Sequence, residues 1–297
     1  MACLTTATQM ETESNSKSSI LVVEDSPNER AGLSMLLERA GFSVTAAADG
    51  IEGLAQLEQK KFDLLLVDAG LPRMGGIEML SRLPAQPRPK VLVITGDGTA
   101  ETALGALREH AEQFLEKPVD PKQLVESIRE TLDAPPVAGK IRVLSADPHF
   151  VELRIPCERA VADRLQEFMK RLESGLPQKE RASVELAFHE LLLNAIEWGG
   201  RMDPACEVLI TFLRTPRLLL YRIADPGAGF DASKLDHAAA GHADEDPCAH
   251  IEAREAKGMR PGGYGIVLAE SMVDELVYNE AHNEVVLLKY LEGKKAA

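Results

Sequence analysis

The stretch "FDLLLVD", residues 62–68, decides the fold of the first half of the chain. It places four consecutive aliphatic residues directly before an acid. Such short continuous apolar runs are typical of strands buried on both faces of a parallel sheet. "SILVVED" (19–25) and "KVLVIT" (90–95) repeat the pattern, and "FSVTAAAD" (42–49) and "AEQFLEK" (111–117) are weaker strand candidates. The sequence therefore predicts five strands over 19–133.

Helical stretches separate these strands. "NERAGLSMLLERAG" ends at Gly41, which suits a helix C-terminus, and "DPKQLVESIRETL" begins with Asp120 as N-cap and Pro121 at the first helical position. Five such β–α repeats predict an α/β fold with a doubly wound, parallel five-stranded sheet of the flavodoxin-like type. In this architecture the chemistry lies at the carboxyl ends of the strands.

Length and charge narrow the class of protein. A chain of 297 residues predicts two domains. The net charge of -14 argues against sequence-independent binding to nucleic acid or to anionic membranes. No apolar run is long enough to span a bilayer, and the polar segment 1–18 is not a secretory signal but a disordered tail. The four scattered Cys indicate free thiols in a reducing compartment, so we expect a cytoplasmic protein.

A second domain follows a short linker. "DAPPVAGK" breaks the first pattern, so we place the linker at 134–140 and the second domain at 141–297. An early strand pair, two helices, two strands, a helix and a closing hairpin predict an α/β sandwich with separated helices and strands. An irregular acidic segment at about 231–261 reads as a lid.

Acidic and polar residues end the strands of the first domain. Glu24 and Asp25 end the first strand, Asp68 the third, Thr95 the fourth and Lys117 the fifth. Carboxylates that converge at one sheet edge repel one another, and a divalent cation between them relieves the repulsion. A carboxylate can attack phosphorus to give an acyl phosphate, while a metal and a lysine neutralise the transferring group.

These motifs resemble those of response-regulator receiver domains. The resemblance rests on "ILVVEDSPNER", "LLLVDAGLPRMGG", "VLVITGD" and "FLEKP", and it covers all of 19–133. It implies that a histidine kinase upstream phosphorylates this domain on an aspartate, with Mg2+ as cofactor. The roles that it implies are phosphoacceptor for Asp68, magnesium ligand for Glu24, Asp25, Asp68 and the carbonyl of Gly70, switch hydroxyl for Thr95, phosphate partner for Lys117 and switch aromatic for Phe114.

The second domain carries "HELLLNA", residues 189–195. Glu190 and Asn194 are four residues apart, so they share one face of a helix. A glutamate there could take a proton from an attacking hydroxyl, and an asparagine oxygen could ligate the magnesium of a nucleotide. His189 as a phosphate acceptor and a plain solvated helix face are the alternatives at this point.

Two glycine-rich stretches favour the nucleotide site. "ADPGAGF" places Asp225 at a strand end before Gly227 and Gly229, where the carboxylate could accept from an adenine amino group. "RPGGYGIVLAE" places Gly263 and Gly265 before a helix, whose first N–H groups favour phosphate.

Read together, the three motifs resemble those of the Bergerat-type ATPases of the gyrase, histidine kinase and MutL superfamily. "ELRIP", "LAFHELLLNAIEWG" and "MVDELVYN" make the anti-sigma-factor serine kinases of partner-switching systems the most similar group. The resemblance implies ATP as a ligand and Glu190 as general base. The implied nucleotide contacts are Asn194 for magnesium, Asp225 for adenine, Gly227 and Gly229 for the pocket, and Gly263 and Gly265 for the phosphate loop. Trp198 stands where that family often has His, and we expect a buried aromatic without chemistry there.

Two functions follow from this reading. The first is a response regulator in which phosphorylation of Asp68 controls a serine/threonine kinase acting on an anti-sigma-factor antagonist. The second is a nucleotide-dependent switch that sequesters a sigma factor or another partner with little or no catalysis. The resemblance also leaves a homodimer open. A hybrid sensor histidine kinase is a poor fit, because the linker is too short for a dimerising helical hairpin.

Overall fold

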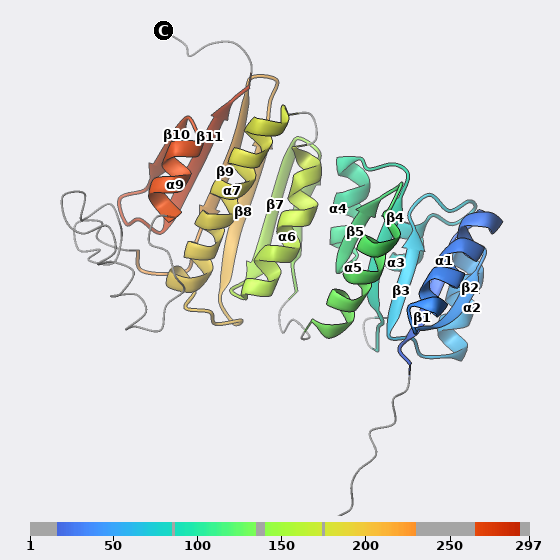
Figure 1. The fold of residues 1–297 in the computed structure, drawn as a ribbon. Helices are drawn as coiled ribbons and strands as arrows, with labels where there is room; N and C mark the ends of the chain where they lie inside the picture. Colours follow the sequence, from blue (N-terminus) through green and yellow to red (C-terminus); the bar gives the residue numbers. More distant parts are fainter. Residues whose placement is uncertain (1–16, 85–86, 135–139, 174–175, 230–264, 292–297) are drawn as a thin grey trace, which may run out of the picture.

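The computed structural model describes residues 17–84, 87–134, 140–173, 176–229 and 265–291. They form two sheets that lie side by side, each covered by helices (Figure 1). Gly263, most of the expected linker and the expected lid lie outside the described residues. Within the described part of the chain, no helix has the length and apolar character needed to cross a membrane.

The N-terminal sheet is parallel and has the order β2-β1-β3-β4-β5, as the apolar runs predict. Helices α1 and α5 pack on one face, and α2, α3 and α4 pack on the other. Its elements are β1 (Ser19–Val23), α1 (Pro27–Arg39), β2 (Ser43–Ala47), α2 (Gly50–Gln59), β3 (Leu64–Asp68), α3 (Gly76–Ser81), β4 (Lys90–Thr95), α4 (Ala100–Arg108), β5 (Gln113–Glu116) and α5 (Pro121–Asp133).

Side-chain caps fix where these helices begin. The Asp49 carboxylate accepts hydrogen bonds from the first amides of α2, and Asp120 does the same for α5, where Pro121 follows. Thr99 caps α4 by accepting from the amide of Thr102. Each cap satisfies amides that have no partner within the helix. The caps thereby set the start of each helix just after a loop at the carboxyl edge of the sheet.

The C-terminal sheet is antiparallel and has the order β10-β11-β9-β8-β7-β6. The helices α6, α7 and α9 lie on one of its faces (Figure 1), which confirms the expected sandwich of sheet and helices. Its elements are β6 (Arg142–Asp147), β7 (Phe150–Pro156), α6 (Arg159–Leu172), α7 (Gln178–Asn194), the π-helical turn η1 (Ala195–Gly199), β8 (Glu207–Arg214), β9 (Leu218–Ala224), α9 (Gly265–Met272), β10 (Glu275–Tyr278) and β11 (Glu284–Tyr290).

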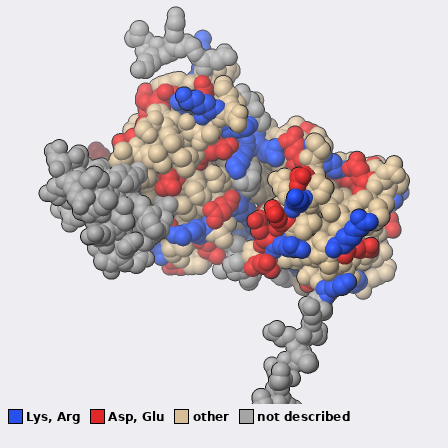
Figure 2. Space-filling view, viewed as in Figure 1, with Lys and Arg blue, Asp and Glu red and all other residues tan. Residues whose placement is uncertain are grey.

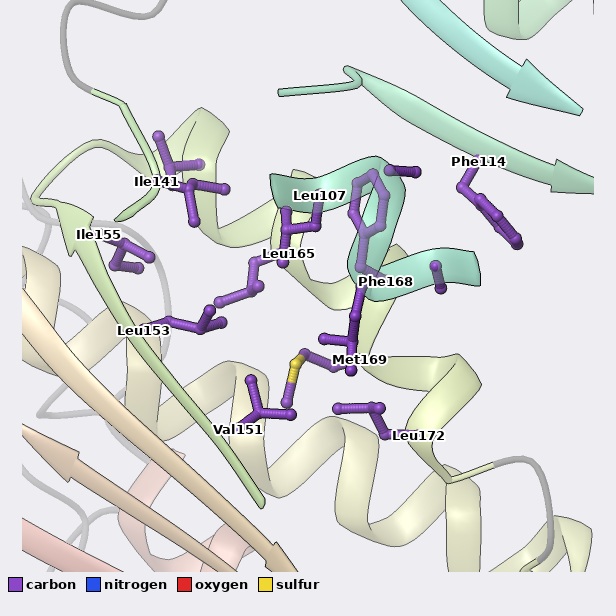
Figure 3. Packing of buried hydrophobic residues seen from close by; sticks show 14 of the residues in the cluster. Leu107, Phe114, Ile141, Val151, Leu153, Ile155, Leu165, Phe168, Met169 and Leu172 are labelled. Atoms are coloured by element: carbon purple, nitrogen blue, oxygen red, sulfur yellow. The ribbon is translucent and has the colours of Figure 1, made fainter. Parts of the chain in front are cut away.

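The helix α6 joins the two domains. Its Phe168 lies in the same hydrophobic cluster as Leu107 of α4 and Phe114 of β5, and the rings of Phe114 and Phe168 have centroids 6.3 Å apart (Figure 3). The Arg164 guanidinium donates from Nε and Nη2 to the carbonyl of Ala111, at 3.0 and 2.6 Å. Burial of both phenylalanines removes apolar area from water and holds the domains together.

One acid is buried in the C-terminal core. Glu173 follows α6, is 1% exposed, and accepts a hydrogen bond from the Tyr221 hydroxyl. Its second oxygen has no hydrogen-bond partner among the described residues. Burial raises the pKa of Glu173 to about 8, although the Tyr221 hydrogen bond opposes the shift. The folded chain therefore keeps a proton on Glu173 that an unfolded chain has lost near neutral pH.

This proton makes stability depend on pH. Because the folded pKa is raised from 4.5 to about 8, the free energy of unfolding falls as the pH rises through that window and levels off above it. Glu173→Gln removes the ionisation. We expect the variant to gain on the order of a few kcal/mol over the wild type between pH 5 and pH 9. Urea unfolding at both pH values measures this gain, and an equal pH slope in the two proteins would contradict it.

Candidate functional site

The acids of the N-terminal domain converge at the carboxyl edge of its sheet. One carboxylate oxygen from each of Glu24, Asp25 and Asp68 lies within 4.8 Å of the other two. Glu24 and Asp68 are buried, whereas Asp25 is exposed. Three hard oxygen ligands at this spacing suit a magnesium ion that keeps several of its waters. The arrangement fits the metal that the sequence predicts here.

Lys117 lies at the centre of this acidic site. Its ammonium group donates to Asp68 at 2.6 Å, to Glu24 at 2.8 Å and to Glu29 at 2.7 Å. Burial lowers the pKa of Lys117, but the bonds to Asp68, Glu24 and Glu29 outweigh it and raise the pKa overall. Burial raises the pKa of Glu24, and the Lys117 hydrogen bond opposes that shift. The lysine stays charged and can neutralise an anion bound at Asp68.

Thr95 and Phe114, the two predicted switch residues, lie on the neighbouring strands β4 and β5. Thr95 ends β4 and is 1% exposed; its hydroxyl donates to the Asp97 carbonyl at 3.1 Å and accepts from the Asp97 amide at 3.0 Å. Phe114 lies on β5, where it packs against Phe168 of α6. Of the two predicted switch residues, Phe114 therefore contacts the second domain, and Thr95 lies on the neighbouring strand β4 of the same sheet.

Close contacts between the backbone and Asp68 fix the loop that follows this residue. The amide of Gly70 donates to Asp68 Oδ1 at 2.8 Å, which holds the carboxylate in place. A Cβ on Gly76 would lie 2.1 Å from the Asp68 carbonyl oxygen, so only glycine fits there. Neither Gly76 nor Glu29 was predicted as part of the site. The two consecutive glycines after Met74 could have indicated Gly76 from the sequence. No sequence pattern indicates Glu29.

In the C-terminal domain, Glu190 and Asn194 lie at the last turn of α7, as their spacing predicts. A Cβ on Gly265, the first residue of α9, would lie 2.7 Å from Glu190 Oε2 and 3.6 Å from Asn194 Nδ2. The first and third sequence motifs therefore meet at the start of α9. A helix start beside an acid and an amide is an arrangement that can hold a nucleotide phosphate and its metal.

Asp225 lies beyond the end of β9, held by backbone on both sides. Its amide donates to the Asn283 carbonyl at 2.9 Å, and its Oδ1 accepts from the Gly227 amide at 2.8 Å. Burial raises the pKa of Asp225, and the Gly227 bond opposes the shift. Asn283 also donates from Nδ2 to the Gly227 carbonyl at 2.9 Å. The carboxylate is therefore held in one position before any ligand binds. A group that accepts a hydrogen bond from a nucleotide base requires such a fixed position.

Gly199 lies directly against Asp225, and Gly229 lies directly against the backbone of Ala281. A Cβ on Gly199, the last residue of η1, would lie 2.1 Å from Asp225 Cγ. Gly229 has a φ of 81°, and a Cβ there would lie 1.6 Å from the Ala281 carbonyl oxygen. Gly199 was not predicted as part of the site. The π-helical turn brings it there, and such turns are frequent at functional sites.

His189 and Trp198 are the other two residues of this region that the sequence singled out. His189 Nε2 lies 3.7 Å from an Asp163 carboxylate oxygen of α6, which supports a packing role for the histidine. The expectation of a buried Trp198 was wrong, because its side chain is 43% exposed. The π-helical turn that carries Trp198 sets its direction, and a hydrophobic pattern does not report such a turn.

Known families match the two halves of the chain. Residues 20–129 match the response regulator receiver domain, and residues 157–289 match the histidine kinase-like ATPase domain. FixJ, a transcriptional regulatory protein of Bradyrhizobium diazoefficiens, is 31% identical over 55% of this chain and 77% of its own length. ZraR, a transcriptional regulatory protein of Salmonella typhimurium, is 37% identical over 39% of this chain, which covers only 26% of ZraR.

A solved structure gives a further match. The receiver domain protein from Methanospirillum hungatei is 36% identical over 40% of this chain and 95% of its own, with a TM-score of 0.39.

Proposed function

Since the chain belongs to the response regulator family through its receiver domain and continues into a histidine kinase-like ATPase domain, we propose that phosphorylation of Asp68 controls an ATP-dependent protein kinase in the second domain. A histidine kinase supplies the phosphoryl group to Asp68. The receiver then sets the rate at which the ATPase domain phosphorylates a serine or threonine of an anti-sigma-factor antagonist.

The chemistry at Asp68 follows from its neighbours. The Asp68 carboxylate forms a bond to the phosphorus of the donor as the bond between that phosphorus and the donor breaks and the donor leaves. The carboxylates of Glu24 and Asp25 would hold a magnesium ion, and the charge of that ion would offset the charge of the transferring group. Lys117 already touches Asp68 and pairs with the product. The carbonyl of Gly70 and the hydroxyl of Thr95 complete the proposed set.

The observation that carries the kinase proposal is the meeting of Glu190, Asn194 and Gly265 at the start of α9. Glu190 accepts the proton of the attacking hydroxyl, which then forms a bond to the γ-phosphorus as the bond to ADP breaks. Asn194 ligates the magnesium of the nucleotide, Asp225 reads the adenine amino group, and Gly227 and Gly229 leave room for the base. Gly263 and Gly265 belong to the phosphate loop of the proposal.

Replacement of Glu190 tests this proposal. The experiment mixes the chain with radiolabelled ATP and candidate antagonist domains, with and without acetyl phosphate. Glu190→Gln is expected to lower phosphate transfer by about 10²- to 10⁴-fold, the usual contribution of a general base. The affinity for ATP is expected to be unchanged, because the glutamine side chain has the same shape as the glutamate that it replaces. Glu185→Gln is the matched control on the same helix; Glu185 lies 3.6 Å from Arg181 and away from the glycine of α9.

The same experiment separates the kinase from a sequestering switch. The wild type could bind its partner only in the presence of nucleotide and transfer no phosphate, whether or not the receiver is phosphorylated. That result would rule out the kinase and leave the sequestering switch. Equal transfer by wild type and Glu190→Gln would leave a kinase that uses another base.

A further inference from the structure

We propose that Cys157 and Cys206 form a reversible disulfide that changes the shape of the proposed adenine site. Cys157 directly follows β7, and Cys206 directly precedes β8. The effect on ATP rests on the proposed function, because it uses the adenine contact of Asp225. The disulfide itself does not depend on that contact.

Strand pairing places the two cysteines opposite each other. Pro156 of β7 pairs with Glu207 of β8, so the antiparallel register sets Cys157 against Cys206. The Cys157 amide donates to the Cys206 carbonyl at 3.0 Å. Both side chains pack in the same hydrophobic cluster, as residues that project from one face of a sheet do. Opposed residues with this bonding have Cα atoms about 5.5 Å apart, within the range of roughly 4.4–6.8 Å that disulfides span.

The two thiols differ in their access to solvent. Cys157 is buried, and burial raises the pKa of its thiol to about 12, with the nearby Cys206 and Asp225 adding to the shift. Cys206 is half-buried, and its thiol lies 4.0 Å from a carboxylate oxygen of Asp203. A small oxidant therefore reacts with Cys206 first, and Cys157 then reacts with the sulfur beside it.

A small disulfide such as oxidised glutathione can drive the reaction. Lys and Arg side chains alternate with Asp and Glu over the described part of the face in Figure 2, and such a mixed surface does not strongly repel a charged molecule. Cys206 Sγ bonds to one glutathione sulfur as the glutathione S–S bond breaks, and the released glutathione takes the Cys206 proton. Cys157 Sγ then bonds to Cys206 Sγ, and the second glutathione leaves with the Cys157 proton. Two cysteines are oxidised, and one glutathione disulfide is reduced to two thiols.

The disulfide stores strain and is therefore easily reduced. Directly opposed Cβ atoms lie about 4.5–5.5 Å apart. A disulfide holds them at about 3.8 Å, so oxidation draws Cys206 toward β7. The Cys206 amide donates to the Asp203 carbonyl at 2.9 Å, so this end of the strand belongs to a turn that can follow. Strained disulfides are the labile and regulatory ones.

The Cys157 thiol packs against the backbone that contacts Asp225. A Cβ on Gly200 would lie 2.0 Å from Cys157 Sγ, and a Cβ on Gly199 would lie 2.1 Å from Asp225 Cγ. Gly199 ends η1, which begins directly after Asn194, the proposed magnesium ligand. Movement of the Cys157 sulfur away from Gly200 therefore removes a contact from the segment between the two proposed nucleotide ligands.

Cys206 pulls on the other end of this segment. The Asp203 amide donates to the Gly200 carbonyl at 3.0 Å, and other amides of the turn donate to carbonyls of η1. Arg201 and Met202 have φ angles of 53° and 57°, in the left-handed region that is strained for residues other than glycine. A strained turn yields when its end is drawn toward β7. Oxidation therefore shifts η1 and with it the proposed adenine contact.

Equilibration in glutathione redox buffers tests the disulfide. Cys3 and Cys248, which lie outside the described residues, are replaced by Ser so that two thiols remain. After acid quenching and alkylation, mass spectrometry is expected to find both thiols alkylated in the reduced buffer. In the oxidised buffer we expect neither to be alkylated and no glutathione to be attached.

Two variants show whether the cysteines react as a pair. Cys157→Ala is expected to carry one glutathione on Cys206 in the oxidised buffer, and Cys206→Ala is expected to keep the buried thiol of Cys157 free. The chain with both cysteines overturns the proposal if it ends with a single glutathione adduct, as Cys157→Ala does, or keeps both thiols in the most oxidised buffer.

The affinity for MgATP and the fluorescence of Trp198 test the effect of the disulfide. Isothermal titration calorimetry is expected to show about fivefold or weaker binding of MgATP to the oxidised form, a usual size for coupled sites, and dithiothreitol is expected to restore the affinity. Because Trp198 lies on η1, its emission without nucleotide is expected to change on oxidation. Cys206→Ala is expected to show neither difference between the two buffers.

The outcomes separate this inference from the proposed function. A disulfide that forms but leaves the MgATP affinity unchanged overturns the link to the adenine site, whatever the emission shows. A changed emission on oxidation, in a protein that binds no MgATP in either form, supports the movement of η1 and overturns the proposed ATP site instead.

Discussion

Replacement of Asp68 by Asn is expected to abolish phosphorylation of the receiver domain. The wild type incubated with acetyl phosphate and Mg2+ gains one base-labile phosphoryl group, and Asp68→Asn gains none. An amide is not a nucleophile toward phosphorus, and it also removes one of the three carboxylates that lie within 4.8 Å of one another. Intact-protein mass spectrometry before and after treatment with base measures the label.

Asp63→Asn is the matched control for this experiment. Asp63 precedes β3 at the opposite end from Asp68, where it accepts hydrogen bonds from the amide and hydroxyl of Ser19. This variant is expected to keep full labelling, and removal of Mg2+ with a chelator is expected to prevent labelling of the wild type. Equal labelling of wild type and Asp68→Asn would place the phosphoryl group on another residue and overturn the proposed acceptor.

Loss of the Asp225 carboxylate is expected to weaken ATP binding by about 10- to 100-fold, since a hydrogen bond to a charged group contributes roughly 1.5–3 kcal/mol. Asp225→Asn keeps the shape of the side chain but offers an amide in place of one acceptor oxygen. Gly199→Ala is expected to have a similar effect, because its methyl group would lie 2.1 Å from Asp225 Cγ and displace the fixed carboxylate. Titration of Trp198 fluorescence with MgATP measures both variants.

Asp203→Asn provides the control for the Asp225 experiment. Asp203 belongs to the turn before β8, where it accepts from the amide of Ala205 at 2.9 Å, and we expect its replacement to leave ATP affinity unchanged. Circular dichroism shows whether Gly199→Ala stays folded. An unchanged MgATP affinity in folded Asp225→Asn and Gly199→Ala would show that the base binds elsewhere, and the adenine assignment would be withdrawn.

Much of the fold could be predicted from the sequence, because the order of apolar and polar residues in a strand reflects which of its faces are buried. The central strands β1, β3 and β4 are continuous apolar runs, since both faces of a parallel sheet are covered. The edge strand β2 has two exposed residues and gives a weaker signal, which is why the sequence marks it only as a weaker strand candidate. The antiparallel strands β8 and β9 alternate buried and half-buried residues, as one helix-covered face requires.

The rest of the site depends on contacts between segments that are distant in sequence. The motifs gave Glu190 and Asn194 from their helical spacing, but only the fold brings Gly199 against Asp225. Glu29 reaches Lys117 from the first turn of α1, across 88 positions of sequence. The side of α6 that contacts the receiver domain also depends on tertiary packing, so Arg164 could not be singled out from the sequence.

The shared packing around Phe168 has a consequence for how such proteins can evolve. The receiver and ATPase families match separate residue ranges of this chain, 20–129 and 157–289, which suggests two interchangeable domains. One hydrophobic cluster nevertheless contains Leu107 and Phe114 from the first part and Leu165 and Phe168 from the second (Figure 3). A receiver recruited from another protein would have to bring a complementary surface for α6. Inheritance of the two parts is therefore coupled, and substitutions on either side of this contact constrain those on the other.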